Sequence, residues 1–162
     1  HGGSNRYYIK KTKNKKIKLS SGFKRNIFLE KKYGLDRLSC FKKFSKKVQN
    51  SKSGLIKLLK KLKKNNIRII GYGASAKAVT VLNYCNLKEN YFDFFYDTTK
   101  QKIGKFLPGT RIKVVKYQKL RNNKIYVFLG AWNFHKEILK KKNSFYNNSG
   151  KFITHIPFPK II

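Results

Sequence analysis

Acidic residues are scarce in this sequence, whereas basic residues are abundant. Asp and Glu together number 6 against 40 Lys and Arg, so the formal net charge at pH 7 is +34. Six carboxyl groups leave little material for the carboxylate pairs that hydrolyse glycosides. No combination of Ser, His and Asp, or of Cys and His, has a spacing that indicates a nucleophilic site. The sequence therefore predicts no catalytic residue within this chain.

Cysteine and long apolar runs are also lacking. The two cysteines, Cys40 and Cys85, lie far apart and form no CxxC pair, so we expect two reduced thiols and no zinc site in this chain. No apolar run approaches the ~18 residues that a membrane-spanning helix needs. The first residues do not have the pattern of a secretory leader. We therefore expect a cytoplasmic location and no membrane span.

The excess of positive charge has two interpretations. Only six of the 40 basic residues are Arg, whereas readers of nucleic acids and phosphates rely on the forked contacts of Arg. Lys, Asn, Ile, Phe and Tyr are all abundant and all have A/T-rich codons, which favours a compositional origin. The alternative is a basic protein that binds nucleic acid or an anionic surface. Either way, we expect non-specific binding to polyanions at low salt.

Strands and helices alternate in the second half of the chain. Apolar and β-branched runs predict strands, and apolar residues three and four apart predict helices. The expected strands are 67–72, 91–97, 111–115, 125–131 and 150–157, and the expected helices are 74–83 and 134–142. The alternation predicts an α/β fold, a Rossmann-like three-layer domain with a mainly parallel sheet of about five strands.

The first part of the chain has a different organisation. Residues 4–10 predict a short strand. From Leu35 onwards, apolar residues at helical spacing predict a long helical segment, with Asp36 in its first turn and a break or kink near Ser53 and Gly54. We divide the chain into the last strand of a preceding domain at 1–11, a basic linker with weak helical tendency at 12–34, and a Rossmann-like C-terminal domain at 35–162.

The strongest local signal is the sequence GYGASA, which begins at Gly71 between an expected strand and an expected helix. In this G-x-G-x-x-A form of the nucleotide-binding turn, Gly71 permits the tight turn and Gly73 lets a phosphate approach the backbone. The helix N-terminus, Ser75 and Lys77 would supply donors to an anion. Asp97 ends the next strand, where a ribose-binding carboxylate would lie. The alternative is a glycine turn that serves packing only.

Two further segments carry side chains suited to a ligand site. Pro108 and Gly109 form a turn before the strand expected at 111–115. Trp132 and Asn133 follow the next expected strand at its carboxyl end, the edge where open α/β sheets bind ligands. The indole can stack on a base or sugar, and the amide can hydrogen-bond it. Plain core packing is the alternative for Trp132.

Four segments with these features occur in one order: GYGASAKAVTVLNYC from Gly71, DTTKQKIGKFLPGT from Asp97, AWNF from Ala131 and GKFITHIP from Gly150. Together they resemble the C-terminal domain of the S-adenosylmethionine-dependent sugar C-methyltransferases. Those enzymes methylate a carbon of a nucleotide-linked deoxy-keto sugar. The opening HGGSNRYYI resembles the last strand of that family's central domain. The resemblance spans roughly residues 35–160, with this opening in addition.

The resemblance implies that the chain is part of a transferase of deoxysugar biosynthesis. The family carries an N-terminal zinc domain and a central domain that binds S-adenosylmethionine, and we expect both as partners outside this chain. In the intact enzyme, a base removes the proton beside the sugar ketone, and the enolate attacks the methyl group of S-adenosylmethionine. That base is expected outside this chain. The chain alone is therefore expected to bind no cofactor and to be inactive.

The same resemblance implies that this domain holds the nucleotide-diphosphate sugar. The substrate-binding residues predicted from type and position are Gly71, Tyr72, Gly73, Ser75, Lys77, Asp97, Lys102, Pro108, Gly109, Trp132, Asn133 and Arg6, with His1 as a neighbour of the shared active site. The sequence departs from the family where Thr98 and Thr99 replace Asn-Pro and Ala78 replaces a Gly, which leaves the ligand's identity open. A free-standing dinucleotide-binding module is the other alternative.

Overall fold

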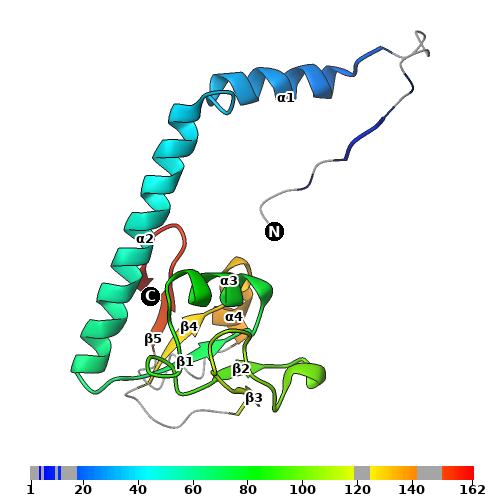
Figure 1. Ribbon diagram of the computed structural model, residues 1–162. Coiled ribbons are helices and arrows are strands. Elements are labelled where there is room, and N and C mark those ends of the chain that lie inside the picture. Colours follow the sequence, from blue (N-terminus) through cyan, green and yellow to red (C-terminus); the bar gives the residue numbers. More distant parts are fainter. Residues whose placement is uncertain (1–3, 5, 10, 12–17, 119–124, 142–150) are drawn as a thin grey trace. The chain divides into compact units, whose positions relative to one another are not determined.

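The computed structural model describes residues 4, 6–9, 11, 18–118, 125–141 and 151–162 (Figure 1). The helices are α1 (Ser21–Lys32), α2 (Leu38–Lys64), α3 (Ala76–Tyr84) and α4 (His135–Lys141), with short 3₁₀ helices η1 (Lys100–Lys102) and η2 (Trp132–Phe134). The strands are β1 (Arg68–Tyr72), β2 (Phe95–Asp97), β3 (Val114–Lys116), β4 (Ile125–Leu129), β5 (Lys151–Thr154) and β6 (Lys160–Ile161). The chain divides into two compact units, His1–Gln49 and Asn50–Ile162.

The second unit is built on one sheet with the strand order β3-β2-β1-β4-β5-β6. The neighbours pair in parallel from β3 to β5, and β6 pairs antiparallel with β5. The first five strands have the Rossmann order, which reverses direction across the sheet between β1 and β4. The predicted α/β fold with a mainly parallel sheet is confirmed. The sixth strand was not predicted, because two strand residues carry no readable periodicity.

Helices cover both faces of this sheet (Figure 1). Leu59 of α2 and Leu82 of α3 belong to the same buried cluster as Phe128 of β4. On the opposite face, Ile138 of α4 packs in a second cluster with Ile70 of β1. Burial on both faces explains why the strands are continuous apolar runs. The predicted three layers are thus α2 with α3, the sheet, and α4.

The long helical segment differs from the prediction in two details. Helix α2 runs unbroken through Ser53 and Gly54, because burial of the neighbouring Leu55 and Leu59 outweighs the ~1 kcal/mol helix penalty of glycine. Asp36 precedes the helix, whose first turn contains no acidic residue. A tight turn in which the Arg37 N–H donates to the Gly34 carbonyl at 3.0 Å delays the helix start.

The first unit contains more helix than the sequence suggested. Within the stretch predicted as a linker, α1 is a regular helix of 12 residues, and the Ser20 hydroxyl caps it by accepting the Phe23 N–H at 3.2 Å. Residues 4 and 6–9 are not in a strand here. The predicted strand belongs to a preceding domain, and within the described part of this chain no strand pairs with the segment, so its place in that domain stays a prediction. Among the helices described, none is long and apolar enough to cross a membrane.

Candidate functional site

The carboxyl ends of β1 and β4 meet at the point where the strand order reverses. The Gly73 N–H donates to the Tyr96 carbonyl at 2.8 Å, and the Gly130 N–H donates to the Tyr72 carbonyl at 2.9 Å. The first bond ties the loop after β1 to β2, and the second holds the end of β1 beside the loop after β4. Open α/β sheets bind ligands in the crevice at such a switch point.

Close packing accounts for the glycines at this edge. A Cβ atom at Gly71 would overlap the Phe95 ring. Gly73 has a φ of +86°, and a Cβ atom there would lie 2.7 Å from the Cβ of Ala131. A Cβ atom at Gly130 would overlap the carbonyl oxygen of Gly73. The glycine turn is therefore pressed against the loop that follows β4, as the packing interpretation expects.

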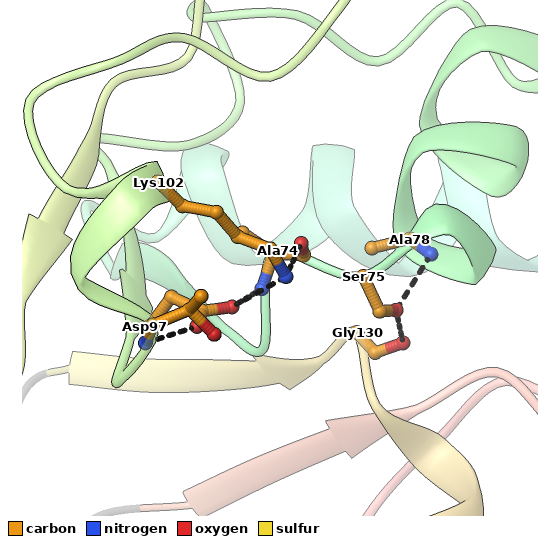
Figure 2. Close-up of polar contacts among 7 residues, drawn as sticks. Ala74, Ser75, Ala78, Asp97, Lys102 and Gly130 are labelled. Atoms are coloured by element: carbon orange, nitrogen blue, oxygen red, sulfur yellow. Dashed lines mark hydrogen bonds and ion pairs between the residues drawn. The ribbon is translucent and has the colours of Figure 1, made fainter.

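Asp97 fixes the backbone of the glycine turn (Figure 2). Its Oδ2 accepts the Ala74 N–H at 2.8 Å, and its Oδ1 accepts the Thr99 N–H at 2.8 Å. The Lys102 ammonium lies 3.5 Å from Oδ2 and donates to the Ala74 carbonyl at 2.8 Å. Burial alone would raise the pKa of Asp97, but the bonds from Thr99 and Ala74 and the charge of Lys102 lower it overall.

The turn's own donors are largely engaged within the chain. Besides the Gly73 and Ala74 N–H groups, the Ser75 N–H donates to the Gly73 carbonyl at 2.8 Å. The buried Asp97 carboxylate accepts backbone N–H groups through both of its oxygens. This arrangement differs from a dinucleotide site, in which the carboxylate bonds to the ribose. Within the described ranges, no three His, Cys, Asp or Glu side chains gather as metal ligands.

Ser75 joins α3 to the sheet edge. Its hydroxyl donates to the Gly130 carbonyl at 3.0 Å and accepts the Ala78 N–H at 3.2 Å, which caps the helix (Figure 2). Lys77, in the first turn of α3, is half-buried. Of the predicted residues around the turn, Ser75 and Asp97 thus hold the edge together, and Lys102 brings an ammonium group to Ala74 and Asp97.

Aromatic side chains gather beside the turn. Tyr72, at the end of β1, is half-buried and meets Tyr117 edge-on with ring centroids 6.1 Å apart. Tyr117 also meets Tyr96, at 5.3 Å. Burial, with Tyr117 and Asp97 nearby, raises the pKa of Tyr72, so its phenol stays protonated at neutral pH. Sequence reasoning missed Tyr117, because only the parallel pairing of β3 with β2 brings it to this edge.

Trp132 and Asn133 lie in η2, directly after β4, and both are half-buried. The Trp132 carbonyl is 2.9 Å from Nδ1 of His135, which fixes the start of α4 against η2. The structure thus brings Trp132 and Asn133 to the same sheet edge as Tyr72 and Gly73, as the sequence predicted.

Pro108 and Gly109 lie elsewhere. Nδ2 of Asn83, in the last turn of α3, donates to the Pro108 carbonyl at 2.9 Å, and a Cβ atom at Gly109 would overlap the Asn83 carboxamide. Because α3 starts at the switch point and its nine residues span about 13 Å, the turn sits at the far end of that helix. The structure does not bring it to the glycine turn.

The remaining two predicted residues, His1 and Arg6, belong to the first unit. His1 lies outside the described residues. Arg6 is exposed and belongs to the first unit. Their role beside a shared active site stays a prediction.

The strand order and the engaged glycine turn define a Rossmann-like α/β domain. The chain matches the profile of the family described as C-methyltransferase C-terminal domain over residues 1–157, and it belongs to that family. It is 30% identical over 134 residues to the C-methyltransferase NovU of Streptomyces niveus, a match that covers 82% of this chain and 32% of NovU. The chain thus spans about a third of that relative's length. The family inferred from the four sequence segments is confirmed.

Proposed function

We propose that this chain holds and orients a nucleotide-diphosphate sugar for C-methylation by an S-adenosylmethionine-dependent enzyme of which it forms one part. Membership of the C-methyltransferase family supports the reaction class. The observation that carries the proposal is the sheet edge at the switch point. There Tyr72, Trp132 and Asn133, all half-buried, lie beside a turn whose backbone is already fixed.

The chemistry of this edge suits such a ligand. Tyr72 and Trp132 offer aromatic surfaces for a base or a sugar ring, and Asn133 offers an amide that both donates and accepts. Lys77 supplies positive charge for a diphosphate at the start of α3, and Lys102, whose charge balances Asp97, offers an N–H donor. We include Arg6 and His1 as contributions from the shared cleft. Pro108 and Gly109 act at a distance from the ligand in this proposal.

In this proposal the chain contributes to the reaction by positioning the sugar. Holding the sugar carbon in line with its reaction partner can lower the barrier by several kcal/mol. We place the base, S-adenosylmethionine and the zinc ion in other domains of the enzyme. The engagement of Asp97 with Ala74 and Thr99 supports this assignment, because it leaves this turn without a ribose-binding carboxylate.

Trp132 makes the proposal testable by fluorescence, because it is the single tryptophan of the chain. We expect a nucleotide-diphosphate sugar to change its emission saturably at about 0.3 M salt, where non-specific binding to polyanions is suppressed. Asn133→Ala should weaken binding about tenfold, the worth of one lost hydrogen bond to a charged or polar group. Asn90→Ala, in an exposed turn, is the matched control. An emission that does not saturate, or equal affinity for pyrophosphate alone, would refute the proposal.

A further inference from the structure

The first unit leaves an unusual amount of apolar surface uncovered. No residue of α1 is buried, and the buried residues of α2 all belong to the second unit. We call the exposed apolar side chains between positions 18 and 49 the α1–α2 surface; they are Leu19, Phe23, Ile27, Phe28, Tyr33, Leu35, Leu38, Phe41 and Phe44. Helices bury their apolar side against another element in stable domains. Among its described residues, the first unit has no core that does so.

The spacing of apolar residues along α2 shows that this surface continues the apolar stripe that is buried at the other end of the helix. Leu38, Phe41, Val48, Leu55, Leu59 and Leu62 follow one another at intervals of three, four or seven residues, so they share one side of the helix. The sheet covers the C-terminal part of this stripe, where Leu59 is 0% exposed. At the other end of the same helix, Leu38 is 69% exposed.

Helix α1 has the same property. Phe23 and Ile27 stand four residues apart on one side of the helix and are both exposed. An isolated helix of 12 residues is marginal in water, even with a Ser20 cap. A surface that packs against this side would supply the missing stabilisation.

We propose that the α1–α2 surface docks onto the part of the C-methyltransferase that lies outside this chain. The chain accounts for only 32% of the length of NovU, so most of such an enzyme remains to provide the covering surface. The choice of this occupant rests on the proposed function, in which the sugar-holding domain must meet the domain that supplies the methyl group.

Charge favours this occupant over a second copy of the chain. Basic side chains flank the apolar ones on both helices, at Lys24, Arg25, Lys31, Lys32, Lys42, Lys43, Lys46 and Lys47. Glu30 and Asp36 are the acidic residues between positions 18 and 49. Two copies would bring like charges together, whereas an apolar partner with an acidic rim would be complementary.

The test mixes the full chain with NovU from which the segment shared with this chain has been deleted, its fold checked by circular dichroism. We expect saturable one-to-one association by sedimentation. Phe41→Glu and Phe23→Glu should each weaken it at least about tenfold, as removal of a buried aromatic anchor does. Phe158→Glu is the matched control, because Phe158 is also an exposed phenylalanine but lies in the second unit. No association, or association that Phe41→Glu leaves unchanged, would overturn the proposal.

Two further measurements separate the alternatives. A dimer of the chain alone that Phe41→Glu dissociates would assign the surface to a second copy and overturn the docking proposal. The Trp132 titration with nucleotide-diphosphate sugar is repeated on the Phe41→Glu chain, where we expect no change. Loss of docking with unchanged sugar binding supports the surface assigned here, whereas docking without any sugar binding refutes the proposed function alone.

Discussion

At the scale of single residues, Asp97 shows how a ligand-type residue can serve the fold. Its position at the end of β2 is the one where dinucleotide-binding domains keep a ribose-binding carboxylate. Here the carboxylate accepts N–H groups from Ala74 and Thr99 and faces Lys102. The residue thus fixes the loop that lines the proposed site, and the cation next to it neutralises the buried charge.

Replacement of Asp97 by Asn should lower the free energy of unfolding by about 1–3 kcal/mol at neutral pH, because charged hydrogen bonds are lost. The folded pKa of Asp97 is lowered, so its stabilisation is present above the ordinary pKa of Asp and is lost as pH falls through the folded value. The difference between wild type and variant should therefore shrink in acid. Urea unfolding across pH measures this.

Asp93→Asn is the control for that measurement. The Asp93 carboxylate pairs with the Arg68 guanidinium at 2.7 Å. The two side chains are 27% and 52% exposed, so loss of this ion pair should cost at most about 1 kcal/mol. Equal penalties for the two variants would show that Asp97 does not hold the turn.

His155 predicts a second dependence on pH. It is buried, stacks on Phe128 with ring centroids 5.2 Å apart, and neither ring nitrogen has a hydrogen-bond partner among the described residues. Burial lowers the pKa of His155 to about 4 from an ordinary 6.5. The unfolded chain therefore takes up a proton between these values while the folded chain does not, so stability falls by about 3 kcal/mol as pH drops through this window.

His155→Phe should remove this part of the pH dependence, because a phenyl ring preserves the stack and has no proton to bind. Thermal unfolding from pH 7 to pH 4 compares the two chains. An unchanged slope in the variant would mean that His155 is not the titrating group.

At the scale of elements, the turn after β1 can be tested with two glycines that share one backbone conformation. Gly73 and Gly104 have φ values of +86° and +83°. A Cβ atom at Gly104 would meet nothing within 4 Å, whereas at Gly73 it would press on Ala131. Gly104→Ala should cost about 1 kcal/mol from strain alone, and Gly73→Ala about 1–3 kcal/mol more from overpacking.

Denaturant unfolding of both variants gives the comparison. If Gly73→Ala costs no more than Gly104→Ala, the loops after β1 and β4 are not in the close contact described here. Gly73→Ala should also weaken the Trp132 response to nucleotide-sugar, because Ala131 directly precedes that tryptophan.

The elements also show what sequence reasoning can reach. The strand β1 and the helix α3 were predicted within two residues, because a bounded apolar run and a glycine turn are local signals. The strand expected at 91–97 is shorter, since the Asp93 N–H still bonds to Ile69 but the ladder of β2 begins only at Phe95. Contacts between residues far apart in the sequence could not be predicted. The bond from Asn83 places Pro108 at the far end of α3, and a turn motif does not indicate which helix the turn will contact.

The candidate site shows the same limit. Trp132 and Asn133 were placed correctly, because they follow a strand whose carboxyl end must reach the switch point. The roles of Asp97, Lys102 and Ser75 depend on bonds across the fold, so their neighbourhood could be predicted from the sequence but their partners could not. His155, expected as a strand residue, lies just beyond β5 in a buried position that periodicity does not reveal.

At the scale of the whole molecule, the chain combines a Rossmann-like sheet with a first unit whose described residues form no buried core. It belongs to the C-methyltransferase C-terminal domain family and spans 32% of NovU. The net charge of +34 will attract polyanions at low salt whatever its origin. Any ligand test on this chain therefore has to be made at elevated salt.

The central claim is best tested by an NMR titration of the chain at elevated salt with a nucleotide-diphosphate sugar, S-adenosylmethionine, NADH and a short DNA. We predict saturable shifts with the nucleotide-sugar, centred on Tyr72, Trp132 and Asn133, and none with S-adenosylmethionine. Tight NADH binding at the glycine turn, or DNA binding that persists at high salt, would contradict the proposed function in sugar binding.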